Sequence, residues 1–361
     1  MRVLVIGAGQ LSLMLAEAGS RLGIEVDRLD PFSGTLRHGT SLDPVDYQLN
    51  ALLARATVVT AEIEHLPDNA LVQQLLAARH FPGARALQLI ADRLPQKRLL
   101  DDLSVATAPW LNCDSATALD QAIDRFHGDM VLKRRRGGYD GRGTLLCDAA
   151  SPRPANDWLD DTIVEQRIPF RRELSIVGAR NAAGDCVFYP MTENYHRHGI
   201  LRLSLAPAEV APAMQQQAEQ SLQKIMSALD YVGVMALECF DTGDQLLANE
   251  VAPRVHNSGH WTQAGADICQ FALHLRALTD LPMPTPRVFG PHAMVNLIGN
   301  DFAEALRSAA GHRLHWYGKT PRPGRKVGHI NLQHSDASIL RDQASALMNT
   351  LIDASENRQG S

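Results

Sequence analysis

The first thirty residues contain the pattern that most restricts the fold of this chain. An apolar run, "RVLVIGAG", ends in glycines, a segment with apolar residues at helical spacing follows and stops at Gly23, and "IEVDRLD" is a second apolar run. This order is typical of a β-strand, an α-helix and a second, parallel strand. The segment at 57–66, "TVVTAEIEHL", repeats the strand pattern. We therefore expect the first ninety residues to form a small open parallel sheet covered by helices.

The glycine turn after the first strand allows several interpretations. A dinucleotide-binding fingerprint needs a third glycine where Ser12 stands, although Asp30 does supply an acid at the end of the second strand. A nicotinamide oxidoreductase is therefore one alternative. Glycines at such a turn also present backbone N–H groups to an anion, so a phosphate or carboxylate ligand is expected there unless the turn is purely structural.

The pattern of predicted elements changes near residue 92 and again near residue 284. A helix is expected at 92–103, and short strands separated by glycine-containing loops follow it. Further helices are expected at 207–229, 262–278 and 336–352, with two strands around the turn "TGD" between the first two of these.

Composition excludes several classes of protein. With 361 residues and 45% hydrophobic content the chain can bury a large core, and its net charge of −5 argues against a protein that coats nucleic acid. The five cysteines have no paired spacing, so neither a zinc site nor a disulfide framework is indicated. No apolar run approaches the ~20 residues of a membrane span, and no targeting segment is visible. We expect a soluble cytoplasmic protein with neither nucleic acid nor a membrane as partner.

A glycine-rich basic stretch, "KRRRGGYDGRG", occupies 133–143. It lies between two predicted strands, so it is not a Walker loop, which precedes a helix. Its glycines let backbone amides approach a polyphosphate, and Lys133 can reach phosphate oxygens as a point charge. We interpret the stretch as a flexible lid over a nucleotide, with a solvated basic turn as the alternative.

Two acidic residues, Glu238 and Glu250, stand in otherwise apolar runs on the two strands of a predicted hairpin. If the loop between the strands holds an odd number of residues, the acids are diagonal neighbours on one face, about 7–8 Å apart. Two carboxylates at this spacing suit Mg²⁺ carrying nucleotide phosphates, with Asn249 as a further oxygen ligand. Two solvent-facing acids on an edge strand are the alternative.

Two loops in the last third of the chain are rich in functional side chains. In "APRVHNSGHWT" at 252–262, Arg254 offers a planar fork to an anion, His256 can exchange protons and Asn257 can orient a polar substrate. The loop "KTPRPGRKVGH" at 319–329 combines cations with prolines, which suits a phosphomonoester or, as the alternative, solvated charge.

Taken together, these motifs resemble the ATP-grasp enzymes and, more narrowly, the 5-(carboxyamino)imidazole ribonucleotide synthase family of purine biosynthesis. The likeness runs over nearly the whole chain, and its most specific motif is "NEVAPRVHNSGHWTQ". One departure lies at the first turn, where the family's usual "GQLGRM" is "GQLSLM", with Ser12 and Leu13.

The resemblance implies the architecture and the reaction. It implies an N-terminal doubly wound domain (1–92), an ATP-grasp domain (93–283) with a lid around 105–170, and a small C-terminal domain (284–361), assembled as a homodimer. ATP, bicarbonate and aminoimidazole ribonucleotide would react with Mg²⁺ or Mn²⁺ present. Bicarbonate would attack the γ-phosphoryl group to give carboxyphosphate, which would break down to phosphate and CO₂ beside the exocyclic amine. A formate-using ribonucleotide ligase or another carboxylate–amine ligase remains an alternative.

The same comparison implies site residues. ATP would contact Arg93, Lys133, Gly138, Tyr139, Asp140, Gly141, Arg142, Gly143, Thr144, Glu165, Gln166, Ile168, Glu173, His196, Asn249 and Glu250. The metal ion would bind Glu238 and Glu250. Aminoimidazole ribonucleotide would contact Gln10, Glu62, Tyr139, Arg142, Lys319 and Arg325. Bicarbonate and the reacting amine would lie among Arg254, His256, Asn257 and Lys326, with His256 as the candidate for proton transfer and an orienting role as its alternative.

Overall fold

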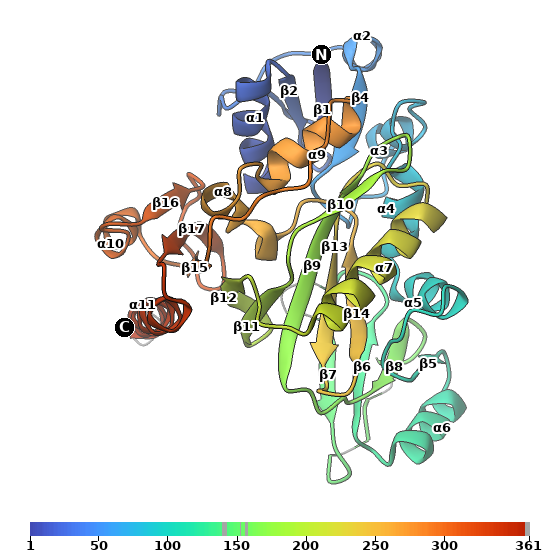
Figure 1. Cartoon of the computed structure of the whole chain (residues 1–361). Coiled ribbons are helices and arrows are strands. Elements are labelled where there is room, and N and C mark those ends of the chain that lie inside the picture. Colours follow the sequence, from blue (N-terminus) through green and yellow to red (C-terminus); the bar gives the residue numbers. More distant parts are fainter. Residues whose placement is uncertain (139–142, 152, 156–157, 358–361) are drawn as a thin grey trace.

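Three β-sheets organise the chain in a computed structural model that describes residues 1–138, 143–151, 153–155 and 158–357 (Figure 1). The first sheet belongs to the N-terminal unit, the second to the segment that follows it, and the third runs from the middle of the chain to its C-terminal part.

The N-terminal unit has the strand, helix and strand order that the sequence predicts. Strand β1 (Arg2–Ile6) pairs in parallel with β2 (Glu25–Leu29) and β4 (Val58–Ala61), and α1 (Gln10–Leu22) connects the first two. An edge strand that the sequence did not predict, β3 (Leu36–His38), runs antiparallel to β2. The other helices of this unit are α2 (Leu49–Arg55), α3 (Ala70–Leu76) and α4 (Ala84–Ile90).

The second sheet carries the glycine-rich basic stretch. Helix α5 (Arg93–Asp102) precedes it, and Asp92 caps this helix by accepting a hydrogen bond from the amide of Leu94. The antiparallel strands follow the order β5 (Trp110–Cys113), β8 (Thr162–Gln166), β6 (Met130–Arg134) and β7 (Thr144–Cys147), and α6 (Ala116–Phe126) packs against them. The stretch joins β6 to β7 directly, as predicted, although its residues 139–142 lie outside the described residues.

The third sheet has nine strands and is antiparallel throughout its described pairs. Its order is β14 (Leu246–Ala252), β13 (Gly233–Asp241), β9 (Arg172–Arg180), β11 (Thr192–Arg197), β12 (Ile200–Ala206), β15 (His292–Ile298), β17 (Lys326–Gln333) and β16 (Arg313–Trp316), while β10 (Cys186–Phe188) pairs with β9. The pairing of β12 with β15 therefore makes the predicted central and C-terminal parts share one sheet.

Helices cover this sheet on its two sides (Figure 1). They are α7 (Pro212–Ala228), α8 (Thr262–Gly265), α9 (Gln270–Leu278), α10 (Phe302–Ser308) and α11 (Ala337–Asn357). The single helix expected at 262–278 is wrong, because the chain leaves the helical conformation between α8 and α9. Ala266 is extended there and bridges Val288, so pairing with a distant segment overrides local helical spacing.

Apolar packing fixes the N-terminal unit to the third sheet. Leu15 of α1 and Phe271 of α9 are fully buried in one core cluster. Gly19 lets α1 lie close to the start of β2, since a Cβ there would lie 2.8 Å from the carbonyl oxygen of Ile24 and 2.9 Å from Val26 Cγ2. The turn after β1 is thereby held next to the elements that follow β14, and Figure 1 shows α1 beside α9.

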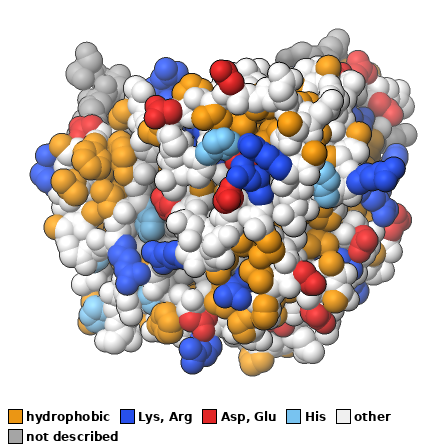
Figure 2. Space-filling view, turned by 90° about the horizontal axis from the view of Figure 1, so that it is seen from above, with side chains coloured by type: hydrophobic (Ala, Val, Ile, Leu, Met, Phe, Trp, Pro, Cys, Tyr) orange, Lys and Arg blue, Asp and Glu red, His pale blue; other side chains and the backbone are white. Residues whose placement is uncertain are grey.

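The surface carries mixed charge. On the face in Figure 2, basic, acidic and hydrophobic side chains are interspersed, and the described residues of that face form no continuous basic surface. Among the helices within the described ranges, none is both long and apolar enough to cross a membrane.

Candidate active site

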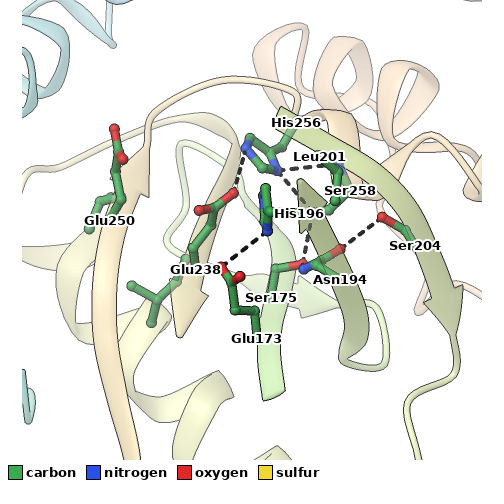
Figure 3. Close-up of polar contacts among 12 residues, drawn as sticks. Glu173, Ser175, Asn194, His196, Leu201, Ser204, Glu238, Glu250, His256 and Ser258 are labelled. Carbon is green, nitrogen blue, oxygen red and sulfur yellow. Dashed lines mark hydrogen bonds and ion pairs between the residues drawn. The ribbon is translucent and has the colours of Figure 1, made fainter. Parts of the chain in front are cut away.

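The two acids of the predicted hairpin lie directly opposite each other. Glu238 on β13 pairs with Glu250 on β14, so their side chains leave the same face of the sheet (Figure 3). The expected diagonal arrangement is wrong, because Asp241 pairs with Leu246 and the loop between them holds four residues, an even number. If the pairing of β13 and β14 stayed regular from Asp241 and Leu246 onward, Glu238 would lie opposite Asn249, and the side chain of Glu250 would point to the other face of the sheet. A β-bulge after Glu238 adds one residue to β14 and restores the shared face.

Electrostatics make this acid pair receptive to a cation. Burial raises the pKa of Glu238 to about 7; the charge of His196 opposes this, and the carboxylates of Glu250 and Glu173 add to it. The side chains of Glu238 and Glu250 keep 21% and 36% of their surface exposed, so a hydrated ion can reach both. Among the described residues, no group of three or more His, Cys, Asp or Glu side chains is arranged to hold a metal ion. Two carboxylates on one face could hold a divalent ion that takes its remaining ligands from phosphate and water oxygens.

Two of the residues expected at the nucleotide lie beside the acid pair. His196 Nδ1 is 3.1 Å from Glu173 Oε2. Burial lowers the pKa of His196, but the hydrogen bond to Glu173 and the charge of Glu238 outweigh this and raise it. The structure thus brings Glu173, His196 and Glu238 together in one cluster of polar side chains (Figure 3), and the expected contacts with ATP stay predictions.

Lys133 and Glu165 belong to a buried cage of charges. The Lys133 ammonium donates to Glu165 Oε2 and to Asn249 Oδ1, at 2.9 Å in both cases. On the other carboxylate oxygen, Lys97 Nζ lies 3.1 Å from Glu165 Oε1, and it also donates to the hydroxyl of Thr107. Burial raises the pKa of Glu165, yet the two lysines outweigh it and lower the pKa to about 2.

Lys97 is a functional candidate that the sequence interpretation missed. Only 2% of this residue is exposed, and it lies between the buried Leu94 and Leu100 on α5. A lysine at helical spacing within an apolar stripe is the signal that could have identified it, because such a charge is buried only with a partner.

Arg93 connects the base of the predicted lid to the acid pair. Its guanidinium donates to the carbonyl oxygens of Arg134 at 2.9 Å and Gly138 at 3.2 Å, and Nη2 lies 3.5 Å from Glu250 Oε2. Gly143 and Thr144 lie at the other end of the lid, where the Arg134 amide donates to the Gly143 carbonyl. The predicted contacts Tyr139, Asp140, Gly141 and Arg142 lie outside the described residues. Gln166 ends β8 and is exposed, and Ile168 is partly exposed just after it.

The loop after β14 brings its polar side chains to the acid pair. His256 Nε2 lies 3.3 Å from Glu238 Oε1, and Arg254 Nη2 lies 2.7 Å from Glu64 Oε1. Burial lowers the pKa of His256 well below its usual value, and the cations of Arg254 and Lys326 add to this. Both polar atoms of the Asn257 side chain are buried with no hydrogen-bond partner among the described residues, which is typical of a group that awaits a ligand.

Glu62 occupies the anion position at the start of α1. Its carboxylate accepts from the amides of Gly9 and Ser12, the latter at 2.7 Å, and the Ser12 hydroxyl donates to the Gly9 carbonyl at 3.0 Å. Gly7 has φ of 127°, and a Cβ there would lie 2.2 Å from Glu62 Cγ. The expected phosphate or carboxylate ligand of this turn is therefore the protein's own side chain. Beside it, Lys319 donates to the Gln10 side chain, so three of the predicted substrate residues meet here.

Replacing Glu62 with glutamine should weaken this cap. An amide NH₂ would face one of the two backbone donors, so we expect the free energy of unfolding to fall by about 0.5–2 kcal/mol. Urea denaturation of the ligand-free protein would measure the change. Glu209→Gln, an identical substitution at an exposed position, serves as the control. Equal stability of the Glu62 variant and the wild type would contradict the capping role.

Comparisons with known proteins place the chain in a family. Three family models match it: the ribonucleotide synthetase preATP-grasp domain at residues 1–91, the ATP-grasp domain at 98–271 and the phosphoribosylaminoimidazole carboxylase C-terminal domain at 292–343. The chain is 46% identical to the N5-carboxyaminoimidazole ribonucleotide synthase of Escherichia coli K12, over 96% of this chain and 94% of that protein. The chain belongs to the N5-carboxyaminoimidazole ribonucleotide synthase family.

Solved structures agree with this assignment. The N5-carboxyaminoimidazole ribonucleotide synthetase of Thermus thermophilus superposes with a TM-score of 0.81 at 39% identity, covering 97% of this chain and 98% of that one. The Aspergillus clavatus N5-carboxyaminoimidazole synthase, in complex with ADP and 5-aminoimidazole ribonucleotide, gives a TM-score of 0.83 at 27% identity over 98% of each chain.

Membership in the N5-carboxyaminoimidazole ribonucleotide synthase family confirms three conclusions from the sequence. They are the resemblance, the fold class with its preATP-grasp, ATP-grasp and small C-terminal parts, and an ATP-grasp ligase of purine biosynthesis. The nicotinamide oxidoreductase, the nucleic-acid binder and the formate-using ligase are therefore set aside. The domain limits and the roles of individual site residues stay predictions.

Proposed function

We propose a division of labour among these residues for the carboxylation of aminoimidazole ribonucleotide with ATP and bicarbonate. The acid pair Glu238 and Glu250, placed on one face by the β-bulge, carries the proposal, because it is the arrangement best suited to a nucleotide-bound cation. When bound there, Mg²⁺ or Mn²⁺ would neutralise charge on the triphosphate during phosphoryl transfer. The homodimer and a cytoplasmic location also stay predictions.

Lys133 and Arg93 would hold the phosphates of ATP against the acid pair. Lys133 is aimed by Glu165 and by Asn249, the residue that precedes Glu250 on β14. Arg93 reaches from α5 to the base of the lid and to Glu250 at once, so it would link lid position to phosphate binding. Both groups are positioned before ATP arrives, which limits the entropy lost on binding.

Arg254, His256, Asn257 and Lys326 would surround bicarbonate and the reacting amine. The ion pair with Glu64 fixes the plane of the Arg254 guanidinium, so its remaining donors face a small anion in a defined direction. The amide of Asn257, which has no hydrogen-bond partner within the described part of the chain, can both donate to and accept from the substrate. A site closed by the lid would protect carboxyphosphate from water.

Gln10, Glu62, Lys319 and Arg325 would receive the ribonucleotide. Because Glu62 already fills the start of α1, its carboxylate would accept from ribose hydroxyls, and the phosphate would go to the cations of the 319–329 loop. The relative from Aspergillus clavatus in complex with ADP and 5-aminoimidazole ribonucleotide supports a site of this kind.

The proposed reaction can be tested by following ADP release. We expect the release to require bicarbonate, which accepts the γ-phosphoryl group to give carboxyphosphate, and aminoimidazole ribonucleotide, whose exocyclic amine takes up the CO₂ that carboxyphosphate yields. Formate and amino acids should not replace bicarbonate. Formate-dependent ADP release would contradict the proposal and favour a formate-using ligase.

A further inference from the structure

A chain of buried side chains runs from His256 into the third sheet (Figure 3). The Ser258 hydroxyl lies 2.8 Å from His256 Nδ1, Ser175 Oγ lies 2.8 Å from Ser258 Oγ, and Asn194 Nδ2 lies 2.8 Å from Ser175 Oγ. Ser204 completes the chain, with Oγ 2.8 Å from Asn194 Oδ1. The two residues next to His256 in this chain, Ser258 and Ser175, are fully buried, and Asn194 is 5% exposed. Solvent therefore has little access to these hydrogen bonds.

The amide of Asn194 sets the direction of the chain at its inner end. Its Nδ2 lies 3.5 Å from the carbonyl oxygen of Thr192, which can only accept. If the oxygen and nitrogen of the Asn194 amide were exchanged, Asn194 Oδ1 would face the carbonyl oxygen of Thr192, and both atoms can only accept. The nitrogen therefore faces Ser175 and donates to it, and the Ser204 hydroxyl donates to the amide oxygen.

The direction passes through the two serines to the histidine. Ser175 Oγ accepts from Asn194, so the hydroxyl hydrogen of Ser175 is available to Ser258 Oγ. If this hydrogen pointed in another direction, it would be a buried donor without an acceptor. Ser258 in turn directs its hydrogen to His256 Nδ1. The backbone amide of Ser258, which can only donate, also points at Nδ1 from 3.3 Å. Two donors therefore converge on Nδ1, and this nitrogen carries no hydrogen.

We propose that Asn194, Ser175 and Ser258 are positioning residues that hold His256 as the neutral tautomer with its hydrogen on Nε2. A neutral imidazole carries one hydrogen, and the nitrogen aimed at Glu238 Oε1, 3.3 Å away, is Nε2. His256 thus presents a hydrogen-bond donor to the acid pair and has no free lone pair there. The inference rests on the proposed function only where it assigns this donor an orienting role in carboxylation. Because Nε2 already carries a hydrogen, His256 in that role does not accept the proton of the amine.

The tautomer can be read directly by nuclear magnetic resonance. Protein with ¹⁵N-labelled histidine rings, free of substrates and metal, would be studied by long-range ¹⁵N–¹H correlation, and His256→Asn would assign the signals of His256. We expect the shift of a hydrogen-bearing nitrogen at Nε2 and of a bare nitrogen at Nδ1. A hydrogen on Nδ1 in the wild-type protein would overturn the inference.

Two variants test the positioning residues. Ser258→Ala removes the hydroxyl donor from Nδ1, and Asn194→Asp replaces the directing donor by an acceptor. Each should raise the share of the Nδ1–H tautomer and lower kcat by about 10- to 100-fold, with the KM for ATP unchanged. Ser221→Ala, which removes a hydroxyl that donates to the carbonyl oxygen of Gln217 on α7, is the control. It should change neither the share of the Nδ1–H tautomer nor kcat. An unchanged tautomer in both folded variants would contradict the positioning role.

The two tests separate this inference from the proposed function. The tautomer is measured without substrates, so hydrogen on Nδ1 would contradict the inference and leave the reaction standing. Failure of bicarbonate-dependent ADP release would contradict the reaction, whereas the tautomer would be unaffected.

Discussion

Replacing Glu250 with glutamine should lower kcat for ADP release by roughly 100- to 1000-fold, because one of the two carboxylates that hold the cation loses its charge. The variant should also need a higher magnesium concentration for its remaining activity. Its fold should be unaffected, since Glu250 is partly exposed and its contact with Arg93 contributes little to stability. Steady-state assays at saturating aminoimidazole ribonucleotide and bicarbonate would measure the effect.

The control for this prediction is Glu219→Gln, the same chemical change on α7, where the carboxylate accepts from Gln215. It should keep wild-type kcat and the wild-type magnesium requirement. If Glu250→Gln retained at least half of the wild-type turnover, the acid pair would not be the cation site.

Replacing Glu165 with glutamine should lower the free energy of unfolding by about 3–5 kcal/mol, because it leaves Lys97 as a buried charge without a counter-ion. Adding Lys97→Met should recover much of this loss, since the double variant buries neither charge. ATP affinity should not recover with it, because Lys133 also loses the carboxylate that aims it. Urea denaturation of the two single variants and the double variant would give the coupling between the two positions.

The effect of pH on this cage follows from the low pKa of Glu165, about 2. A carboxylate with a depressed pKa stabilises the folded state fully above its unfolded pKa of about 4.3 and loses that contribution as pH falls from there toward 2. The stability difference between wild type and Glu165→Gln should therefore shrink below about pH 4. It should also shrink as pH rises above neutral, because burial lowers the pKa of Lys97 and the variant has no carboxylate there to oppose this, so Lys97 can lose its proton in the folded variant. For the urea denaturation series, a double variant whose loss of unfolding free energy equals the sum of the losses in Glu165→Gln and Lys97→Met would contradict the cage.

Local patterns predicted much of the fold because their causes are local. The run before Gly7, the helical spacing up to Gly23 and the Asp92 cap each act within a few residues, and β1, α1 and α5 appear where they are expected. The helix expected at 262–278 was wrong because Ala266 pairs with Val288, a contact that no window around 266 contains.

The candidate site was predicted as a set of residues but not as an arrangement. Carboxylates in apolar strands and cations among glycines are visible in the residue order, so Glu238, Glu250 and Lys133 were identified. The residues that support the site were harder to see, because Lys97, which pairs with Glu165, and Asn194, which bonds Ser175, look ordinary in their own segments and meet these partners only in the fold.

The residue order carried the resemblance that implied the family and its three-part architecture, and it singled out residue types that suit phosphoryl transfer, since motifs are properties of short segments. Folding in three dimensions settled which groups meet. A bulge of one residue put Glu250 on the face of Glu238, Glu62 filled the helix terminus expected to bind a ligand, and a buried amide oriented the hydrogen of His256. These outcomes depend on strand register and side-chain packing between distant segments, which a linear pattern does not specify.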